Sequence, residues 1–405
     1  MRDLFRRRRM WRRRGELRRS YDAVIIGGGS HGLATAYYLA HEHGLRNVAV
    51  LEKSYIGSGA AGRNTTILRS NYKTPESARF YDASLKLYEG LSQELDFNLL
   101  FSQVGHITLA HSDRAMFVMA NRAEVNRLGG IDSRLIYPDE IQRLCPPMQV
   151  DNPNATYPIM GALYHPPGGI IRHDAVVWGY ARGADRGGVE IHPHTEVTGV
   201  NRANGRVTGV ETNRGPIDTD VVVSCTAGWS SLTCGMAGVD LPISTHILQA
   251  CVTEPMKPLL DIVIVSSQMH IYISQTDRGE FLIGAEIEPW TTYRMQGTLN
   301  FLQEVTRHAL ELFPQLERVR ILRSWAGLCD LTPDYSPILG ATEVEGFHVS
   351  AGWGTYGFKA APIVGKTLAE LVATGRTPEL IRPFSLERFY EDRLVSELAA
   401  AAVSH

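Results

Sequence analysis

The sequence lacks any apolar run that approaches the roughly 20 residues of a membrane-spanning helix, which argues against an integral membrane protein. It lacks internal repeats, and no cysteines are paired as CxxC. Free thiols in a reducing compartment are therefore expected, not a disulfide framework or a zinc site, and we expect no metal. The chain has 405 residues, of which 44% are hydrophobic and 21% charged. These values are typical of a soluble protein with roughly two or three domains. The cysteines are Cys145, Cys225, Cys234, Cys251 and Cys329.

Positive charge is concentrated at the N-terminus. Residues 1–20 contain ten arginines and two acidic residues, a net charge of +8, whereas the remainder carries 31 basic and 41 acidic residues. Such a segment can contact nucleic acid, anionic lipid or an acidic partner, or it can be a solvated arm. Four apolar residues interrupt the arginines, which favours a partner protein over nucleic acid. They are Leu4, Phe5, Met10 and Trp11.

Residues 22–52 have the pattern of a dinucleotide-binding unit. A short β-branched strand, 22–26, runs into Gly27-Gly28-Gly29-Ser30-His31-Gly32, which fits G-x-G-x-x-G. An amphipathic helix and a second strand, 47–51, follow, and Glu52 ends that strand. The glycines permit a tight turn and close approach of a pyrophosphate to a helix N-terminus, and the acid can accept hydrogen bonds from a ribose. The unit alone predicts dinucleotide binding without separating NAD from FAD.

Three later segments extend this prediction. Residues 56–64 form a loop of small residues, and residues 351–362 form a glycine-rich loop before a helix. Residues 194–231 predict a hairpin, a buried strand and a turn. The order of these elements favours FAD. The candidate cofactor-binding residues are Gly27, Gly29, Ser30, His31, Gly32, Glu52, Lys53, Ser58, Arg63, Asn64, Thr65, Val197, Ala227, Gly228, Trp229, Gly354, Gly357, Phe358 and Lys359.

Other boundaries follow from local signals. Thr74 and Pro75 predict an N-cap and the first position of a helix. Residues 104–110 predict a strand, and residues 299–313 predict a helix that Pro314 ends.

Three segments carry a family resemblance: residues 168–174 (GGIIRHD), 332–337 (TPDYSP) and 357–359 (GFK). From residue 21 to about residue 390 the chain resembles the amine-oxidising flavoproteins of the glycine oxidase, D-amino acid oxidase and sarcosine oxidase group. Within that group it is most similar to the beta subunits of the heterotetrameric sarcosine oxidases.

The resemblance implies an α/β (α+β) fold with a discontinuous Rossmann-type FAD-binding domain and a substrate domain built on a mixed, largely antiparallel sheet. We expect the FAD-binding domain at 21–99, 166–236 and 327–390 and the substrate domain at 100–165 and 237–326. Residues 1–20 would then form a basic arm and residues 391–405 a C-terminal tail.

The resemblance also implies an activity: oxidative demethylation of sarcosine to glycine in the cytoplasm. Hydride would pass to non-covalent FAD and electrons to FMN bonded covalently to His173, and O2 would be reduced to hydrogen peroxide. The one-carbon unit would go to tetrahydrofolate or leave as formaldehyde. Alpha, gamma and delta subunits are implied partners, with NAD and tetrahydrofolate held elsewhere on the complex. The alternatives are a dimethylglycine- or proline-type dehydrogenase subunit, and a non-catalytic flavoprotein scaffold.

Substrate residues are carried over by position. Arg69 and Lys359 match the pair that holds the substrate carboxylate, for which an arginine fork and a lysine charge are suited. Tyr272 and His270 would face the substrate from one side of a roof strand. For His173 the alternative is a capping or hydrogen-bonded histidine at the start of a helix.

The cysteine that binds FAD covalently in the monomeric sarcosine oxidases falls at Gly327, and only a shifted alignment would use Cys329. The lysine that activates oxygen in those enzymes has no counterpart in residues 281–284.

Overall fold

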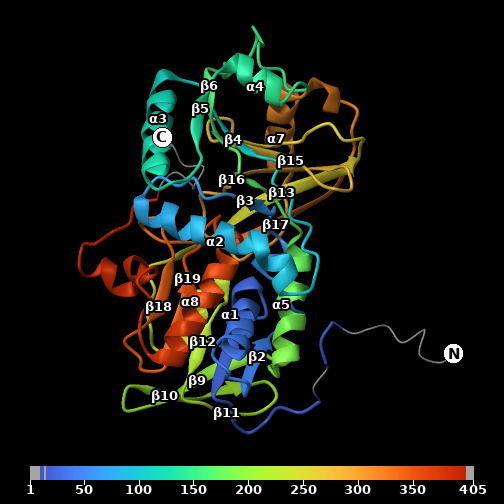
Figure 1. Ribbon diagram of the computed structural model, residues 1–405. Coiled ribbons are helices and arrows are strands. Elements are labelled where there is room, and N and C mark those ends of the chain that lie inside the picture. Colours follow the sequence, from blue (N-terminus) through green and yellow to red (C-terminus); the bar gives the residue numbers. More distant parts are fainter. Residues whose placement is uncertain (1–9, 13–14, 398–405) are drawn as a thin grey trace, which may run out of the picture.

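The structure is a computed structural model that describes residues 10–12 and 15–397, arranged as two lobes with α2 (Pro75–Glu94) between them (Figure 1). Each lobe is built on one large sheet, and a two-stranded sheet, β3 (Ile67–Leu68) with β7 (Gly169–Ile170), pairs segments that are distant in the sequence. Within the described part of the chain every helix is too short or too polar to span a bilayer.

The lower lobe holds a six-stranded sheet in the order β18-β19-β12-β1-β2-β8. All of its pairs are parallel except β18 with β19. Its central strands are buried along their whole length, as a sheet covered on both faces requires. The strands are β1 (Ala23–Ile26), β2 (Val48–Glu52), β8 (Glu190–Pro193), β12 (Val222–Ser224), β18 (Ile338–Ala341) and β19 (Phe347–Ala351).

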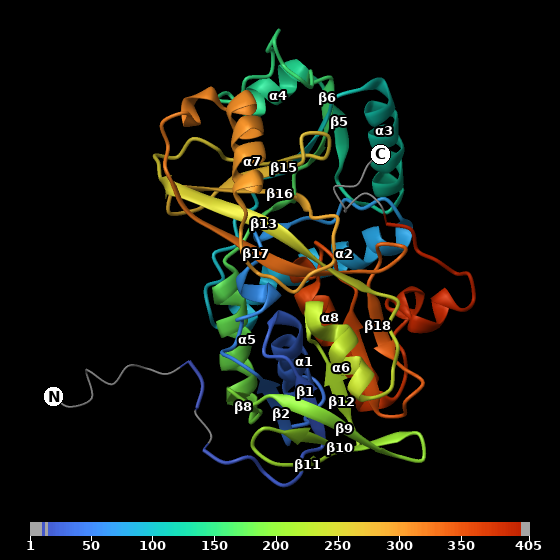
Figure 2. The same ribbon diagram turned by 180° about the vertical axis from the view of Figure 1, so that it is seen from behind.

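Two layers cover this sheet. Ala23 and Ile25 of β1 pack toward α1 (Ser30–His41), α5 (His173–Gly187) and α8 (Ala361–Thr374), whereas Val24 and Ile26 pack into a second core. That second core includes residues of β9 (Val197–Ala203), β10 (Arg206–Thr212), β11 (Ile217–Asp218) and α6 (Ser230–Met236), and Figure 2 shows these elements on the opposite face. The predicted Rossmann-type domain is confirmed.

The upper lobe holds an eight-stranded sheet in the order β17-β13-β16-β15-β14-β4-β6-β5. Every pair is antiparallel except β14 with β4, so the predicted mixed, largely antiparallel sheet is confirmed. Helices α3 (Asp113–Leu128), α4 (Pro138–Leu144) and α7 (Leu299–Leu312) pack on it. The strands are β4 (His106–Ala110), β5 (Arg134–Ile136), β6 (Gly161–His165), β13 (Ser244–Pro255), β14 (Val263–Ser266), β15 (Ile271–Gln275), β16 (Glu280–Ile287) and β17 (Ile321–Leu331).

Strands β13 and β17 continue from the upper sheet to the lower lobe. They are paired along nearly their whole length, from Ser244 with Leu331 to Thr253 with Ile321. At the lower end the Thr245 hydroxyl donates to the Gly228 carbonyl at 2.9 Å, and a Cβ at Gly228 would lie 2.4 Å from Leu328 Cβ. Strand β17 therefore crosses the boundary predicted at residue 327 and packs directly on the lower lobe.

Local signals set several boundaries correctly. The Thr74 hydroxyl accepts from the Ser77 N–H at the start of α2, and α7 ends at Leu312, just before Pro314. Residues 204 and 205 form the β9–β10 turn with φ values of 52° and 79°. The strand predicted from residue 104 begins at His106.

The described part of the N-terminal arm lies against the chain's own acidic residues. Arg12 pairs with Asp185 at 3.3 Å, and Arg18 pairs with Glu190 at 2.8 Å. Trp11 packs on the core of the lower lobe. The proposed partner anchors Leu4 and Phe5 lie outside the described residues.

The described end of the predicted C-terminal tail is docked, not free. Arg388 is buried and donates to both carboxylate oxygens of Asp334, at 2.8 and 3.0 Å. The Val395 N–H donates to the same carboxylate, and buried Glu397 accepts from the Lys73 and Thr74 N–H groups before α2. The segment ending at Glu397 therefore joins the 332–337 loop to the start of α2.

Replacing Arg388 by Met is expected to lower stability by about 3–5 kcal/mol, because the Asp334 carboxylate would stay buried without its partner. Thermal unfolding of the purified chain would measure the loss. An additional Asp334→Asn substitution removes the stranded charge and should recover part of it. Equal melting temperatures for Arg388→Met and the original chain would contradict the prediction.

Candidate active site

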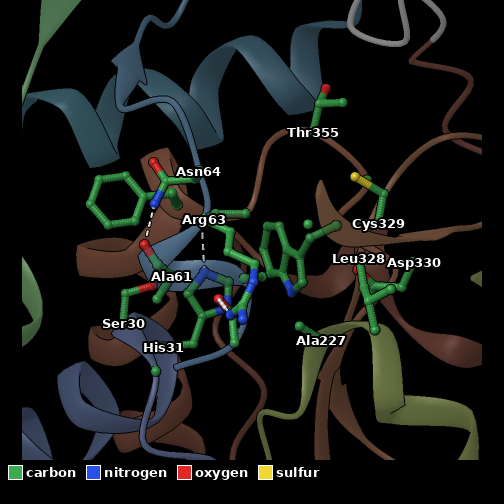
Figure 3. Close-up of a pocket in the computed structure, with 18 of the residues that line it drawn as sticks. Ser30, His31, Ala61, Arg63, Asn64, Ala227, Leu328, Cys329, Asp330 and Thr355 are labelled. Carbon is green, nitrogen blue, oxygen red and sulfur yellow. Dashed lines mark hydrogen bonds between the residues drawn. The ribbon is translucent and has the colours of Figure 1, made fainter. Parts of the chain in front are cut away.

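A cavity of about 370 Å³ lies between the lobes and draws its lining from both sheets. Figure 3 shows the lower-lobe residues Ser30, His31, Arg63 and Asn64 on one side of it, with Leu328, Cys329 and Asp330 of β17 on the other. Asn64 also hydrogen-bonds to the Ala61 carbonyl, which folds back the loop after β2.

The β1–α1 turn is shaped to hold a phosphate group. A Cβ at Gly32 would lie 2.1 Å from the Gly27 carbonyl oxygen, so only glycine lets α1 approach the turn this closely. Gly29 lines the cavity, and the nearest atom to a Cβ built there is 3.8 Å away. Space is therefore left beside the N-terminus of α1, whose N–H groups and dipole favour an anion.

Glu52 lies next to this turn at the end of β2. Its carboxylate accepts from the Gly28 N–H at 3.0 Å and the Ser54 N–H at 2.8 Å, and it lines the cavity. Beside it, Lys53 Nζ lies 4.0 Å from the centre of the Trp229 ring. A fixed carboxylate one strand away from the phosphate turn fits a dinucleotide ribose.

The glycine-rich loop before α8 closes the cavity through contacts with α1 and β17. His31 hydrogen-bonds to Ser350 Oγ at 3.0 Å and to the Gly357 carbonyl at 2.7 Å, and burial lowers its pKa to about 4. Asp330 accepts from the Gly352 N–H at 2.6 Å, and burial raises its pKa to about 6. The turn, the ribose acid and this loop together fit FAD.

Most predicted cofactor residues line this one cavity. Two do not: Gly32 packs against Gly27, and Gly228 packs against Leu328. Their role in the structure is close packing. The predicted residues that do line the cavity are Gly27, Gly29, Ser30, His31, Glu52, Lys53, Ser58, Arg63, Asn64, Thr65, Val197, Ala227, Trp229, Gly354, Gly357, Phe358 and Lys359.

Three cations gather at the other end of the cavity. Arg69 and Lys359 line it, and the Arg69 guanidinium lies 4.4 Å from the Tyr72 ring centre. Buried Arg122 lies behind them and donates, as Arg69 does, to the Asn71 carbonyl. Burial and the charge of Arg69 lower the pKa of Arg122 to about 9. None of the three forms an ion pair with a carboxylate in the described part of the chain, so this end is suited to an anionic ligand.

The pKa of Lys359 is held well below its usual value of 10.5 by burial, with a further contribution from Arg69. The ammonium group will therefore lose its proton at a lower pH than that of an exposed lysine. We expect the dissociation constant of a carboxylate ligand to rise as the pH rises through that depressed pKa. Titration of the bound flavin's absorbance with furan-2-carboxylate at a series of pH values measures this, and the dependence should be weaker in Lys359→Met, where only the arginines remain to titrate.

Tyr272 lines the same cavity from the upper-lobe sheet. It lies on β15 opposite Gly284 of β16, and a Cβ at Gly284 would lie 1.9 Å from its ring. The Tyr272 ring therefore occupies the space that a side chain at position 284 would fill, and it lines the cavity.

Replacing Gly284 by Ala is expected to push the Tyr272 ring out of this position, because the methyl group occupies its place. The affinity for a carboxylate ligand should fall about 10-fold while FAD content stays unchanged, as for the loss of one well-placed contact. Gly90, which is exposed on α2 with nothing near its Cβ, supplies the control Gly90→Ala. An unchanged affinity in Gly284→Ala would show that the ring position does not matter.

The prediction that His270 shares a strand face with Tyr272 is wrong. Residues 267–270 form a turn, and β15 begins only at Ile271. His270 has a φ of 48°, its side chain is exposed, and it does not line the cavity. The left-handed backbone ends the strand alternation on which the prediction depended.

His173 also lies outside the cavity lining. It is the first residue of α5, half-buried beside Gly62, and burial lowers the pKa of its imidazole. Its neighbours Arg172 and Asp174 pair with each other at 3.1 Å. His173 is not the N-cap of α5, because Arg172 occupies that position.

Several lining residues were not predicted. Some of them lie on strands that reach the cavity through long-range pairing, such as β4, β14 and β17. Cys329 is among them, with a thiol pKa raised by burial. Others are His106, Thr108, Ser267, Asp330 and Trp353. Two of them had a local signal: Asp330 stands directly before the 332–337 segment, and Trp353 lies in the glycine-rich loop at 351–362.

The described residues contain no group of three or more His, Cys, Asp or Glu arranged to hold a metal ion.

Comparison with known proteins gives consistent matches. The model of the FAD dependent oxidoreductase family (DAO) matches residues 22–371. Sarcosine oxidase subunit beta of Rhodobacter capsulatus is 45% identical over 390 residues, which cover 96% of this chain and 94% of that one. The same subunit of Rhizobium meliloti is 46% identical over 382 residues, covering 94% and 91%. The crystal structure of L-proline dehydrogenase from P. horikoshii superposes with a TM-score of 0.88 at 30% identity, covering 94% of this chain and 100% of that chain.

Proposed function

Because the chain belongs to the beta-subunit family of the sarcosine oxidases, within the FAD-dependent oxidoreductases, we propose that it oxidises the N-methyl group of sarcosine. The chain is a flavoprotein oxidoreductase that acts on the CH–NH group of its donor. The observation that carries the choice of substrate class is the pair Arg69 and Lys359, which lines the FAD cavity without a carboxylate partner among the described residues.

Each of the residues at this end of the cavity would bind a different part of the substrate. Arg69 presents a planar fork to the substrate carboxylate, and Lys359 adds a point charge. The same cations disfavour an ammonium group nearby, so the amine is bound in its neutral form. Tyr272 covers the substrate from the roof and excludes water. Bound FAD supplies the hydride acceptor for the N-methyl carbon.

We further propose that FMN is bonded to His173. Burial keeps this imidazole neutral, and a neutral imidazole is a competent nucleophile. Because His173 lies outside the cavity, the FMN and the FAD would occupy separate places. When bound there, FMN would supply a second redox centre at which O2 could be reduced to hydrogen peroxide.

The remaining features of the proposal concern the assembly. The chain would work in the cytoplasm as the beta subunit of a complex with alpha, gamma and delta subunits. Tetrahydrofolate would take up the one-carbon unit, or water would release it as formaldehyde. NAD and tetrahydrofolate would bind elsewhere on the complex.

Anaerobic mixing of the purified complex with sarcosine tests the proposal, with flavin bleaching as the expected result. The structural similarity to L-proline dehydrogenase supports a second candidate, a proline-type dehydrogenase subunit. Bleaching by L-proline but not by sarcosine would favour that candidate. Peroxide formation in air separates an oxidase from a dehydrogenase that passes electrons to a carrier.

A further inference from the structure

A buried histidine faces the cavity from the roof and has no part in the binding described so far. His106 is the first residue of β4, is 1% exposed, and lines the cavity together with Thr108. Ile107 and Leu109 of the same strand point into the core of the upper lobe. Strand alternation therefore fixes the His106 imidazole on the cavity side of the sheet.

The hydrogen-bonding capacity of His106 is unused. Both of its ring nitrogens are buried and have no partner in the part of the chain that the structure describes. The histidine opposite it in the ladder, His165, is fully paired: its Nδ1 lies 2.6 Å from the Asp132 carbonyl and its Nε2 accepts from the Ser70 N–H. Leaving a buried polar group unpaired costs about 1–3 kcal/mol, so the site gains if a ligand pairs with it.

The surroundings of His106 set its charge. Burial, together with Arg69, His165, Arg122 and Lys359, holds its pKa well below 6.5. The ring is therefore neutral and offers one lone pair and one N–H. The carboxylate of a bound amino acid is taken up by Arg69 and Lys359, but its amine N–H still needs an acceptor.

The acidic side chains that line the cavity are committed elsewhere or lie on its dinucleotide side. Three acidic residues line it. Glu52 accepts from backbone N–H groups at the β1–α1 turn, and Glu196 stands beside β9 on the dinucleotide side. Asp330 accepts from the Gly352 N–H. Among the described acids, none is left to face the amine beside the cations.

We propose that the His106 imidazole accepts a hydrogen bond from the amine N–H of the bound amino acid and so selects N–H ligands over isosteric acids without one. The inference rests on the proposed function, because Arg69 and Lys359 must first hold the ligand's carboxylate. It adds a specificity-determining contact on the roof.

Two ligands of the same shape test this contact: pyrrole-2-carboxylate has an N–H where furan-2-carboxylate has an oxygen. Each is titrated against the oxidised complex, and the change in flavin absorbance gives its dissociation constant. We expect His106→Leu to weaken the pyrrole acid about 10-fold and the furan acid less than about 2-fold, the loss of one hydrogen bond. His106→Asn keeps an acceptor and should restore part of the preference.

His308 supplies the control. It is a buried histidine on α7 with an unpartnered Nδ1, but it does not line the cavity. We expect His308→Leu to leave both affinities unchanged. If His106→Leu does not retain FAD, the same two titrations on His106→Asn test the proposed hydrogen bond instead.

Unchanged affinities in the His106 variants, or an equal loss for both acids, would overturn the proposed contact while leaving the proposed function intact. If the original complex binds neither acid and is not reduced by sarcosine, the proposed function fails, and the His106 contact fails with it.

Discussion

Replacing Arg69 by Met is expected to lower kcat/KM for sarcosine by about 10²- to 10³-fold. The guanidinium provides charge-assisted hydrogen bonds in a buried site, and truncating one member of such a pair typically costs about 3–4 kcal/mol. The loss should be large because no other described cation except Lys359 lines this end of the cavity. Steady-state kinetics at a fixed pH, with FAD content measured in parallel, would show it.

Arg69→Lys separates charge from geometry. It keeps the positive charge but loses the planar fork, so an intermediate loss is expected. Arg79 is exposed on α2, and Arg79→Met serves as the control that should leave kcat/KM unchanged. A loss of less than about 3-fold in Arg69→Met, well under the cost of a single charged hydrogen bond, would remove Arg69 from the substrate site.

Replacing His173 by Asn is expected to abolish covalent flavin on this chain without changing its FAD. The amide side chain has no comparable nucleophilic nitrogen, whereas the FAD cavity does not include position 173. After acid precipitation, the original chain should retain FMN on the peptide that contains His173 and should release FAD to the supernatant. In His173→Asn all flavin should be released.

The exposed His270 provides the control for this experiment. His270→Asn should leave the covalent flavin in place, because its side chain lies on a surface turn in the other lobe. Release of all flavin from the original chain would remove FMN from the proposal and favour a one-flavin amine dehydrogenase. The oxidase chemistry would then have to proceed on FAD.

The parts of the site that could be predicted are those encoded by neighbouring residues. Gly27, Gly29 and Glu52 lie in one strand–turn–helix–strand unit whose geometry follows from local sequence. Thr74 and Pro314 mark helix ends by the same local rules. Arg69 and Lys359 were found through a resemblance to a family, and the structure brings both to one cavity.

The roof residues could not be predicted because distant pairing places them. His106 reaches the cavity because β4 lies between β14 and β6, so residues 106, 263 and 165 become neighbours. No periodic pattern around residue 106 contains that information. The prediction for His270 is wrong for a different reason. Strand alternation does not apply to this residue, because it lies in the turn before β15 and its left-handed backbone changes the direction of the chain.

The long pair β13 and β17 has a consequence for how substrate enters. The two strands belong to the upper sheet, yet their lower ends are fastened to Gly228 in the lower lobe. A hinge motion that separates the lobes would require the paired strands β13 and β17 to bend, or their contacts at Gly228 to break. We therefore expect the two lobes to keep their relative positions when a ligand binds, and ligand entry to require only local movement around the cavity. Small-angle scattering curves with and without a bound carboxylate should coincide.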